Sequence, residues 1–409
     1  MRHLAWVLLL GFSFAVPWEY SLDLGAPLGN VARLLGLLLL LVAIPAVLQA
    51  GCLRRPGALQ WLTLVLFLWF CCSCFWTIDQ AATLAKLRGY FQEMMIVWLL
   101  WEFAESPRDL RWLLRVFLAG SWVLAILTLA DFRSSDAFAA EQFRFAAYGQ
   151  DPNDVARFLD LGFPLAALLA DGNAGWVEKA LALGYLPLGV VAVLLTASRG
   201  GFLAALVALA GCGAILVRGR QRAVVAGLAA APVLAGIVWA RIPPETFARL
   251  ATIPEQLTRG DLNQRLSIWT AGWHAFVRAP VLGSGAGTFV QAAGLTPIDT
   301  AHNSALSIAV SGGLCALFLA VAIYAAVLAM AWSTGGRLRV ALTVALLVWG
   351  VSSLVGTVEE SRTTWLLFGL TAVAARLAGE EQASLAACFP DPWRGEFAGP
   401  ASAAAALDG

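Results

Sequence analysis

The stretch ALSIAVSGGLCALFLAVAIYAAVLAMA, residues Ala305–Ala331, contains no charged residue. A helix of roughly 20 apolar residues crosses the hydrocarbon core of a bilayer, so this stretch is long enough to span a membrane. Similar stretches recur along the 409-residue chain, which is 60% hydrophobic and 13% charged and has a mean hydropathy of +0.77. This composition is outside the range of soluble domains and predicts an all-α, polytopic integral membrane protein.

Apolar stretches of this kind predict about twelve membrane-spanning helices. The first could be mistaken for a secretory signal, but no small-residue cleavage site follows it. The predicted spans are Leu4–Val16, Val31–Ala50, Leu59–Trp76, Tyr90–Phe103, Leu110–Ala130, Val155–Ala170, Ala180–Thr196, Gly201–Val217, Ala223–Ala240, Ala305–Ala331, Val340–Leu354 and Thr364–Leu377.

The charges of the loops predict an orientation. Arginines without acidic neighbours collect in alternate loops: Arg54 and Arg55; Arg218, Arg220 and Arg222; Arg337 and Arg339. The positive-inside rule makes these loops cytoplasmic, so both termini are expected in the cytoplasm. We expect one transmembrane domain over residues 1–380, a large periplasmic loop over 241–301 and a disordered cytoplasmic tail over 381–409. A formal net charge of +1 gives no basis for nucleic-acid binding.

The large loop contains an amphipathic segment, GDLNQRLSIWTAGWHAFVRAP, at residues 260–280. Asp261 and Gln264 form a variant of the capping box, which predicts that Arg265 lies near the positive end of a helix dipole. Trp269 and Trp273 follow Arg265 at helical spacing and suit a membrane surface. Arg265 is expected to bind an anion or, alternatively, only to reach toward lipid headgroups.

A glycine-rich turn follows in PVLGSGAGTF, residues 280–289, where Gly283, Gly285 and Gly287 alternate. No strand precedes these glycines, so they are not a dinucleotide-binding fingerprint. Two alternatives remain at this point: a plain turn, or a loop whose backbone amides approach a phosphate.

His302 is one of three histidines and lies at the start of the span that opens this section. With Asp299 or Thr300 as N-cap it would occupy the first helical turn, where the dipole favours a neutral imidazole. A neutral imidazole can serve as a general base. The alternative is an interfacial histidine bonded to backbone.

Further polar residues lie at the predicted outer face. Arg199 stands between two spans in LLTASRGGFLAAL, and an arginine at that depth predicts an anionic ligand or a carboxylate partner such as Glu359 or Glu360. The segment RFAAYGQDPNDVARFL, residues 144–159, carries Arg144, Asp151, Asn153 and Arg157 into the sixth span. Together these residues suit an anionic lipid headgroup such as a diphosphate.

The ordered set of motifs resembles the O-antigen ligase and polymerase superfamily of membrane glycosyltransferases, and most closely O-antigen ligase. The similarity covers about Tyr185 to Leu317. It rests on these motifs: Ser198-Arg199-Gly200-Gly201; Arg265-x-x-x-Trp269; Pro280 followed by Gly283-x-Gly285-x-Gly287; and His302-Asn303-Ser304-x-Leu306 with Gly313.

The resemblance implies a C-class glycosyltransferase fold and an active site that faces the periplasm. The implied reaction moves a polysaccharide from undecaprenyl diphosphate to the lipid A core oligosaccharide, which completes lipopolysaccharide. We expect His302, Arg265 and Arg199 to be catalytic. The residues expected to bind donor or acceptor are Arg144, Asn153, Asn303, Trp269, Trp273, Gly283 and Gly285.

No metal or other cofactor is expected, because the predicted outer loops lack a DxD pair and any His/Asp cluster with ligand spacing. Arg265 and Arg199 would bind the diphosphate, and His302 would deprotonate the acceptor hydroxyl for an inverting attack or, alternatively, contact the donor phosphate.

Two other functions are consistent with parts of the sequence. A polymerase or protein O-oligosaccharyltransferase of the same superfamily would differ only in its acceptor. A lipid or small-molecule transporter would fit the composition, but transporters usually have broken helices with polar residues at mid-membrane and internal repeats, and the sequence shows neither.

Overall fold

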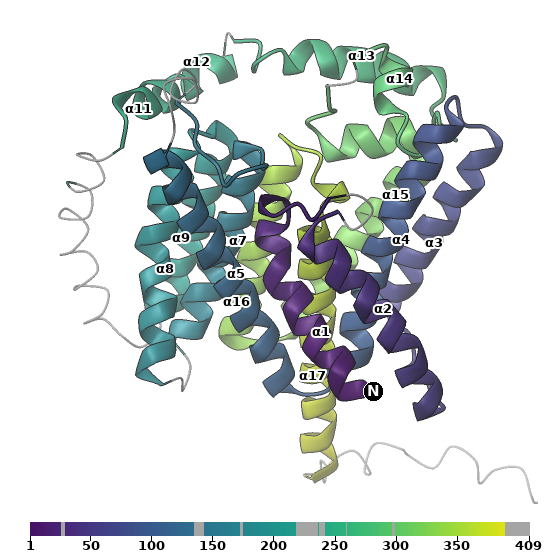
Figure 1. Ribbon diagram of the computed structural model, residues 1–409. Coiled ribbons are helices and arrows are strands. Elements are labelled where there is room, and N and C mark those ends of the chain that lie inside the picture. The colour runs from purple at the N-terminus through teal and green to yellow at the C-terminus, as the bar shows by residue number, and fades with distance from the viewer. Residues whose placement is uncertain are drawn as a thin grey trace, which may run out of the picture.

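The computed structural model describes residues 1–25, 29–134, 143–171, 175–217, 236, 242–258, 260–296 and 299–388. Within these ranges all regular structure is helical, and long helices form a bundle with short helices across one end (Figure 1). Eight helical segments of the described chain are long and apolar enough to cross a membrane. The chain is therefore an all-α polytopic membrane protein, as predicted, although these eight do not establish twelve spans.

Helices cover eleven of the predicted spans. Three of them, α4, α7 and α17, are not among the eight apolar segments. The predicted span Ala223–Ala240 and the arginines Arg218, Arg220 and Arg222 are outside the described residues. The eleven helices are α1 (Arg2–Ala15), α2 (Val31–Ala50), α3 (Ala58–Cys72), α4 (Gln80–Phe103), α5 (Pro107–Ser134), α7 (Pro152–Asp171), α8 (Trp176–Leu195), α9 (Arg199–Val217), α15 (Ser304–Ser333), α16 (Gly336–Ser353) and α17 (Arg362–Cys388).

Two predicted boundaries are wrong. Helix α4 begins at Gln80 rather than Tyr90, because the Asp79 side chain caps it by accepting a hydrogen bond from the Ala82 amide at 3.0 Å. Residues 80–89, which the predicted spans left as a connection, are therefore helical. Helix α17 continues to Cys388, so the predicted disordered tail is helical over residues 381–388. Residues 389–409 are outside the described part of the chain.

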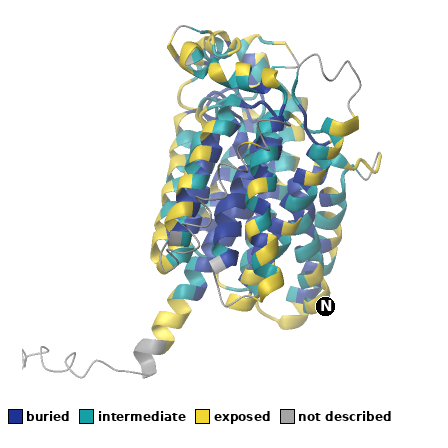
Figure 2. Ribbon diagram, turned by 90° about the vertical axis from the view of Figure 1, so that its left-hand side faces the viewer, coloured by how far each residue is buried: buried dark blue, intermediate teal, exposed yellow. Residues whose placement is uncertain are grey.

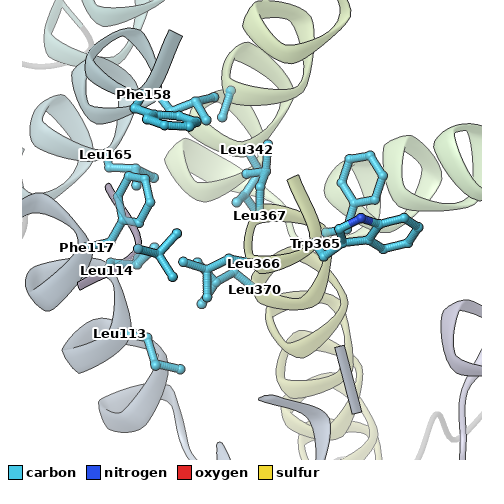
Figure 3. Close-up of a cluster of buried hydrophobic side chains, with 14 of the residues drawn as sticks. Leu113, Leu114, Phe117, Phe158, Leu165, Leu342, Trp365, Leu366, Leu367 and Leu370 are labelled. Atoms are coloured by element: carbon cyan, nitrogen blue, oxygen red, sulfur yellow. The ribbon is translucent and has the colours of Figure 1, made fainter. Parts of the chain in front are cut away.

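Helix α7 lies at the centre of one half of the bundle, in contact with α5, α8, α9 and α16. Buried residues line the middle of the bundle and exposed ones its outside (Figure 2). Figure 3 shows apolar side chains from α5, α7, α16 and α17 gathered in one cluster, among them Leu114, Phe158 and Leu366. Dispersion contacts between such side chains hold membrane helices together where lipid removes the hydrophobic driving force.

Helix α15 is broken inside the bundle, which the sequence analysis did not predict. Gly313 has φ 68° and ψ −167°, so the helical hydrogen bonds around it are interrupted. Three carbonyls at the break are satisfied from outside the helix. The Ser284 and Gly285 amides donate to Val310 and Ser311 at 2.8 and 2.9 Å, and the indole of Trp69 donates to the Gly312 carbonyl at 2.8 Å. The glycine-rich turn is therefore inserted into the break.

Four short helices of the large loop lie across one end of the bundle (Figure 1): α11 (Pro244–Ala251), α12 (Ile253–Thr258), α13 (Arg265–Arg278) and α14 (Phe289–Ala293). The predicted capping box is wrong, because Gln264 is the N-cap of α13 and Asp261 instead accepts a bond from the Asn263 amide at 2.9 Å. Leu262, Asn263 and Gln264 have φ values of 53°, 59° and 65°, so the chain enters α13 through three left-handed residues.

Replacing Gly313 with alanine should lower the thermal stability of the purified protein. A Cβ there would lie 2.1 Å from the Val281 carbonyl oxygen at a φ of +68°, so the inserted turn would be displaced. We expect a loss of several kcal/mol, within the range for strained or overpacked sites. Gly213→Ala in α9 is the matched control, because its Cβ would meet no atom within 4 Å. Equal melting temperatures for the two variants in detergent would contradict the importance of the inserted turn.

Candidate active site

A polar cavity of ≈ 350 Å³ lies between the start of α7, the residues before α15 and the connection from α16 to α17. Cationic, anionic and hydroxyl side chains share its wall. The lining residues are Tyr20, Asp151, Asn153, Asp154, Arg157, Phe158, Thr300, His302, Val355, Gly356, Thr357, Glu360 and Ser361. Its volume admits a sugar, and its lining offers both donors and acceptors to hydroxyl groups.

His302 lines this cavity just before α15. The prediction that it lies in the first turn is wrong, because Asn303 is the N-cap and accepts a bond from the Leu306 amide at 2.9 Å. The Asn303 amide also donates to the Leu354 carbonyl at 3.3 Å. His302 itself has φ 47°, a left-handed conformation that turns its side chain out of the helical path.

The predicted neutral state of His302 has a different origin from the one expected. Burial is the main factor that lowers the pKa of His302, and the positive charge of Arg265 lowers it further. The Asp151 carboxylate acts in the opposite direction. The neutral imidazole therefore persists below the ordinary pKa of about 6.5, because its surroundings disfavour a second cation.

Arg265 is the first residue of α13 and is half-buried. Its guanidinium makes no hydrogen bond or ion pair within the described ranges. Burial lowers the pKa of Arg265, the nearby Asp151 carboxylate raises it, and Arg199 lowers it. A half-buried guanidinium with unused donors beside other cations is a favourable place for a phosphate.

Arg199 connects the start of α9 to the large loop. Its guanidinium donates to the Arg249 carbonyl at 3.2 Å, to the Asn263 side chain at 3.1 Å and to the Thr252 hydroxyl at 2.6 Å. The predicted carboxylate partners are therefore wrong. Glu360 instead pairs with Lys86, at 2.5 Å.

Arg144 lies in the segment before α7 and donates to the Thr196 carbonyl, just after α8, at 3.3 Å. Its guanidinium donates to the Asn153 side chain at 2.8 Å, and the Ser198 hydroxyl donates to the same oxygen at 2.9 Å. Burial lowers the pKa of Arg144, Asp151 raises it, and the charges of Arg265 and Arg199 lower it. Three arginines thus repel one another beside the cavity, and a bound anion would relieve that repulsion.

The remaining predicted residues, two glycines and two tryptophans, are not among those that line the cavity. The Gly283 and Gly285 amides donate to the Ala279 and Ser311 carbonyls at 3.0 and 2.9 Å, so they are not free for a phosphate. The Trp269 indole donates to the Ala301 carbonyl at 3.0 Å and so holds the residue before His302. Trp273 is 56% exposed on α13, where it can contact lipid.

Arg157 was noted in the sequence but given no role. It lines the cavity from the second turn of α7 and pairs with Asp154. Its guanidinium lies where a Cβ at residue 356 would stand, so Gly356 makes room for it. The i,i+3 spacing of Asp154 and Arg157 could have signalled the pair. No sequence signal points to Tyr20 or to residues 355–361, because these walls come from distant segments.

A comparison with protein families matches residues 184–321 to the family model described as O-antigen ligase. Over these residues the chain is similar to the O-antigen ligase family. The matched range contains Arg199, Arg265 and His302, which confirms the resemblance at the level of the O-antigen ligase and polymerase superfamily. This superfamily consists of glycosyltransferase-like membrane enzymes that act on polysaccharides and lipid-linked substrates. No curated protein matches the chain.

The Arg265→Gln variant should have a higher His302 pKa than the wild-type protein. Removing a neighbouring positive charge makes the imidazolium less costly, so protonation would begin at higher pH. NMR titration of ¹³C-labelled histidine in nanodiscs, with His302→Ala used to assign the signal, measures this directly. An unchanged or lower pKa would show that the two side chains do not interact.

Proposed function

We propose that the protein is an inverting, metal-independent O-antigen ligase. It would transfer polysaccharide from undecaprenyl diphosphate to the lipid A core oligosaccharide on the periplasmic face of a bacterial inner membrane. One observation carries this proposal: the charge of Arg265 lowers the pKa of His302, which lines the polar cavity. The Arg265 guanidinium itself has no hydrogen-bond or ion-pair partner within the described ranges. One group suits a hydroxyl, and the other suits a phosphate.

In this proposal the donor diphosphate lies among Arg265, Arg199 and Arg144. As the bond from the anomeric carbon to the diphosphate breaks, negative charge develops on the leaving oxygen. Fixed cations stabilise that charge without reorganising, and each well-placed donor can contribute on the order of 3–4 kcal/mol. Arg199 and Arg144 are already held by protein oxygens, which keeps their positions fixed before the substrate binds.

His302 would act on the acceptor. The acceptor hydroxyl oxygen attacks the anomeric carbon on the face opposite the diphosphate, its proton passes to the neutral imidazole, and the configuration inverts. General-base assistance typically contributes about 10²–10⁴-fold. Asn303 fixes the residue after the base by capping α15, and Trp269 fixes the residue before it. In the alternative role, His302 would contact the donor phosphate.

The proposed topology places the cavity and the large loop at the periplasmic face and both termini in the cytoplasm. Residues 1–380 would form one transmembrane domain that includes the loop over residues 241–301. Arg2 begins α1, and the cavity-lining Tyr20 follows that helix, so α1 carries the chain from the predicted cytoplasmic side to the predicted outer side.

A polymerase or protein O-oligosaccharyltransferase could use the same donor chemistry. Purified protein supplied with lipid-linked glycan alone separates these functions, because a polymerase lengthens the glycan whereas a ligase acts only after lipid A core is added. The broken helix α15 would also suit a transporter. The carbonyls at the break already accept hydrogen bonds from Ser284, Gly285 and Trp69, which makes them less available to an ion.

Arg265→Ala and His302→Ala should each reduce transfer from lipid-linked glycan to lipid A core by at least about 10²-fold, with normal expression and membrane insertion. His274→Ala is the matched control, because His274 is an exposed histidine on α13. Product formation is measured by gel mobility of the glycolipid. Wild-type activity in either variant would remove that residue from the mechanism.

Chelation should leave the purified activity unchanged, because arginines rather than a metal ion would stabilise the leaving diphosphate. The transfer assay is run with and without EDTA, and then with Mg²⁺ or Mn²⁺ restored. Activity that disappears with EDTA and returns with a divalent ion would contradict the metal-independent reaction.

A further inference from the structure

A narrow apolar crevice lies between α2 and α4, with α1 behind it. Apart from Arg33, Gln92 and Arg362 its lining is apolar, so it suits a hydrocarbon chain better than a sugar. Helix α2 contacts α1 and the 3-10 turn at Val16–Ser21, which leaves its side toward α4 open. The lining residues are Leu9, Phe12, Ala32, Arg33, Gly36, Leu37, Leu39, Leu40, Gln92, Met95, Ile96, Leu99 and Arg362.

The charged side chains of the crevice lie toward its outer end. Arg362 donates to Glu19 and, at 3.0 Å, to the Gln92 side chain, so its charge is compensated. Arg33 is exposed in the first turn of α2, and no residue of the described chain forms an ion pair with its guanidinium. The outer end therefore has a net positive charge above an apolar channel, which is the charge pattern that an anionic lipid complements.

The crevice reaches the wall of the polar cavity. Arg362 lines the crevice, whereas the two residues before it, Glu360 and Ser361, line the cavity. In the N-terminal part of the chain, Glu19 pairs with Arg362, and the next residue, Tyr20, lines the cavity. This wall offers hydroxyl and carboxylate groups, which suit sugar hydroxyls. The arginines assigned to the donor, Arg199 and Arg265, are not among the residues of this wall.

We propose that the crevice holds an acyl chain of the acceptor glycolipid, with an acceptor phosphate at Arg33. The sugar head group would then pass Tyr20 and Ser361 into the cavity and present its hydroxyl to His302. This assignment rests on the proposed function and adds to it a separate binding site for the acceptor glycolipid. The donor and acceptor lipids would approach the cavity from different sides, so both can be bound at once.

The Leu37→Trp variant tests whether the crevice binds an acyl chain. Leu37 lines the crevice and is 42% exposed, so an indole there fills the channel from its open side. Its matched control is Leu38→Trp, because Leu38 is 40% exposed but does not line the crevice. In Leu37→Trp a few methylene groups of the acyl chain would no longer be buried in the crevice. The acceptor KM should therefore rise about tenfold, with the donor KM unchanged. Leu38→Trp should match the wild type in both constants.

The Arg33→Gln variant tests the charge, with Arg88→Gln on α4 as its control because Arg88 is also exposed. The acceptor KM should rise about fivefold in Arg33→Gln only, and more at low than at high salt. Equal effects of Leu37→Trp and Leu38→Trp would overturn the proposal. A rise in donor KM instead would show that the polyprenyl chain occupies the crevice, which also overturns it.

Native mass spectrometry of the full-length protein separates failure of this proposal from failure of the proposed function. The protein is incubated with lipid A core glycolipid or with phosphatidylglycerol as the competing anionic lipid. Glycolipid retention that falls in Leu37→Trp but not in Leu38→Trp supports the crevice even if no transfer occurs. Equal retention of phosphatidylglycerol, or unchanged glycolipid retention in Leu37→Trp, would overturn the assignment.

Discussion

The backbone hydrogen bonds between the glycine-rich turn and the break in α15 fix the geometry of the site. Carbonyls inside a membrane protein must be satisfied by protein or trapped water, and Ser284 and Gly285 supply the donors for Val310 and Ser311. The turn follows α13, which carries Arg265, and the broken helix follows His302. These contacts connect the turn that follows α13, the helix that begins with Arg265, to the helix that begins just after His302.

Electrostatic interactions connect the groups to which the proposal gives separate roles. Arg144, Arg199 and Arg265 act on one another through like charges, and Arg265 also lowers the pKa of His302. Like charges gathered in this way would be stabilised by an anionic substrate. Burial and the Arg265 charge both lower the pKa of His302, so in the proposed mechanism Arg265 acts on both the anion and the base.

The sequence was sufficient to predict the helical bundle, because long apolar stretches have few alternatives in a membrane. It also placed Arg199, Arg265 and His302 in one ordered motif set. The sequence did not predict the local geometry. The N-cap of α15 is Asn303, and the amides of Gly283 and Gly285 donate to backbone carbonyls instead of being free for a phosphate. These features depend on which distant carbonyls need donors. The same reason hid the cavity wall at Tyr20 and Ser361, which only the folded chain brings together.

The left-handed run at Leu262, Asn263 and Gln264 has a consequence for how the protein could change over time. Left-handed geometry costs roughly 1 kcal/mol or more at residues that carry a Cβ, with asparagine the least affected. Selection for heat resistance alone would favour glycine at Leu262 and Gln264. Glycine there would also make the segment before Arg265 more flexible. A gain in thermal stability at this bend would therefore come with a less fixed position of the Arg265 side chain.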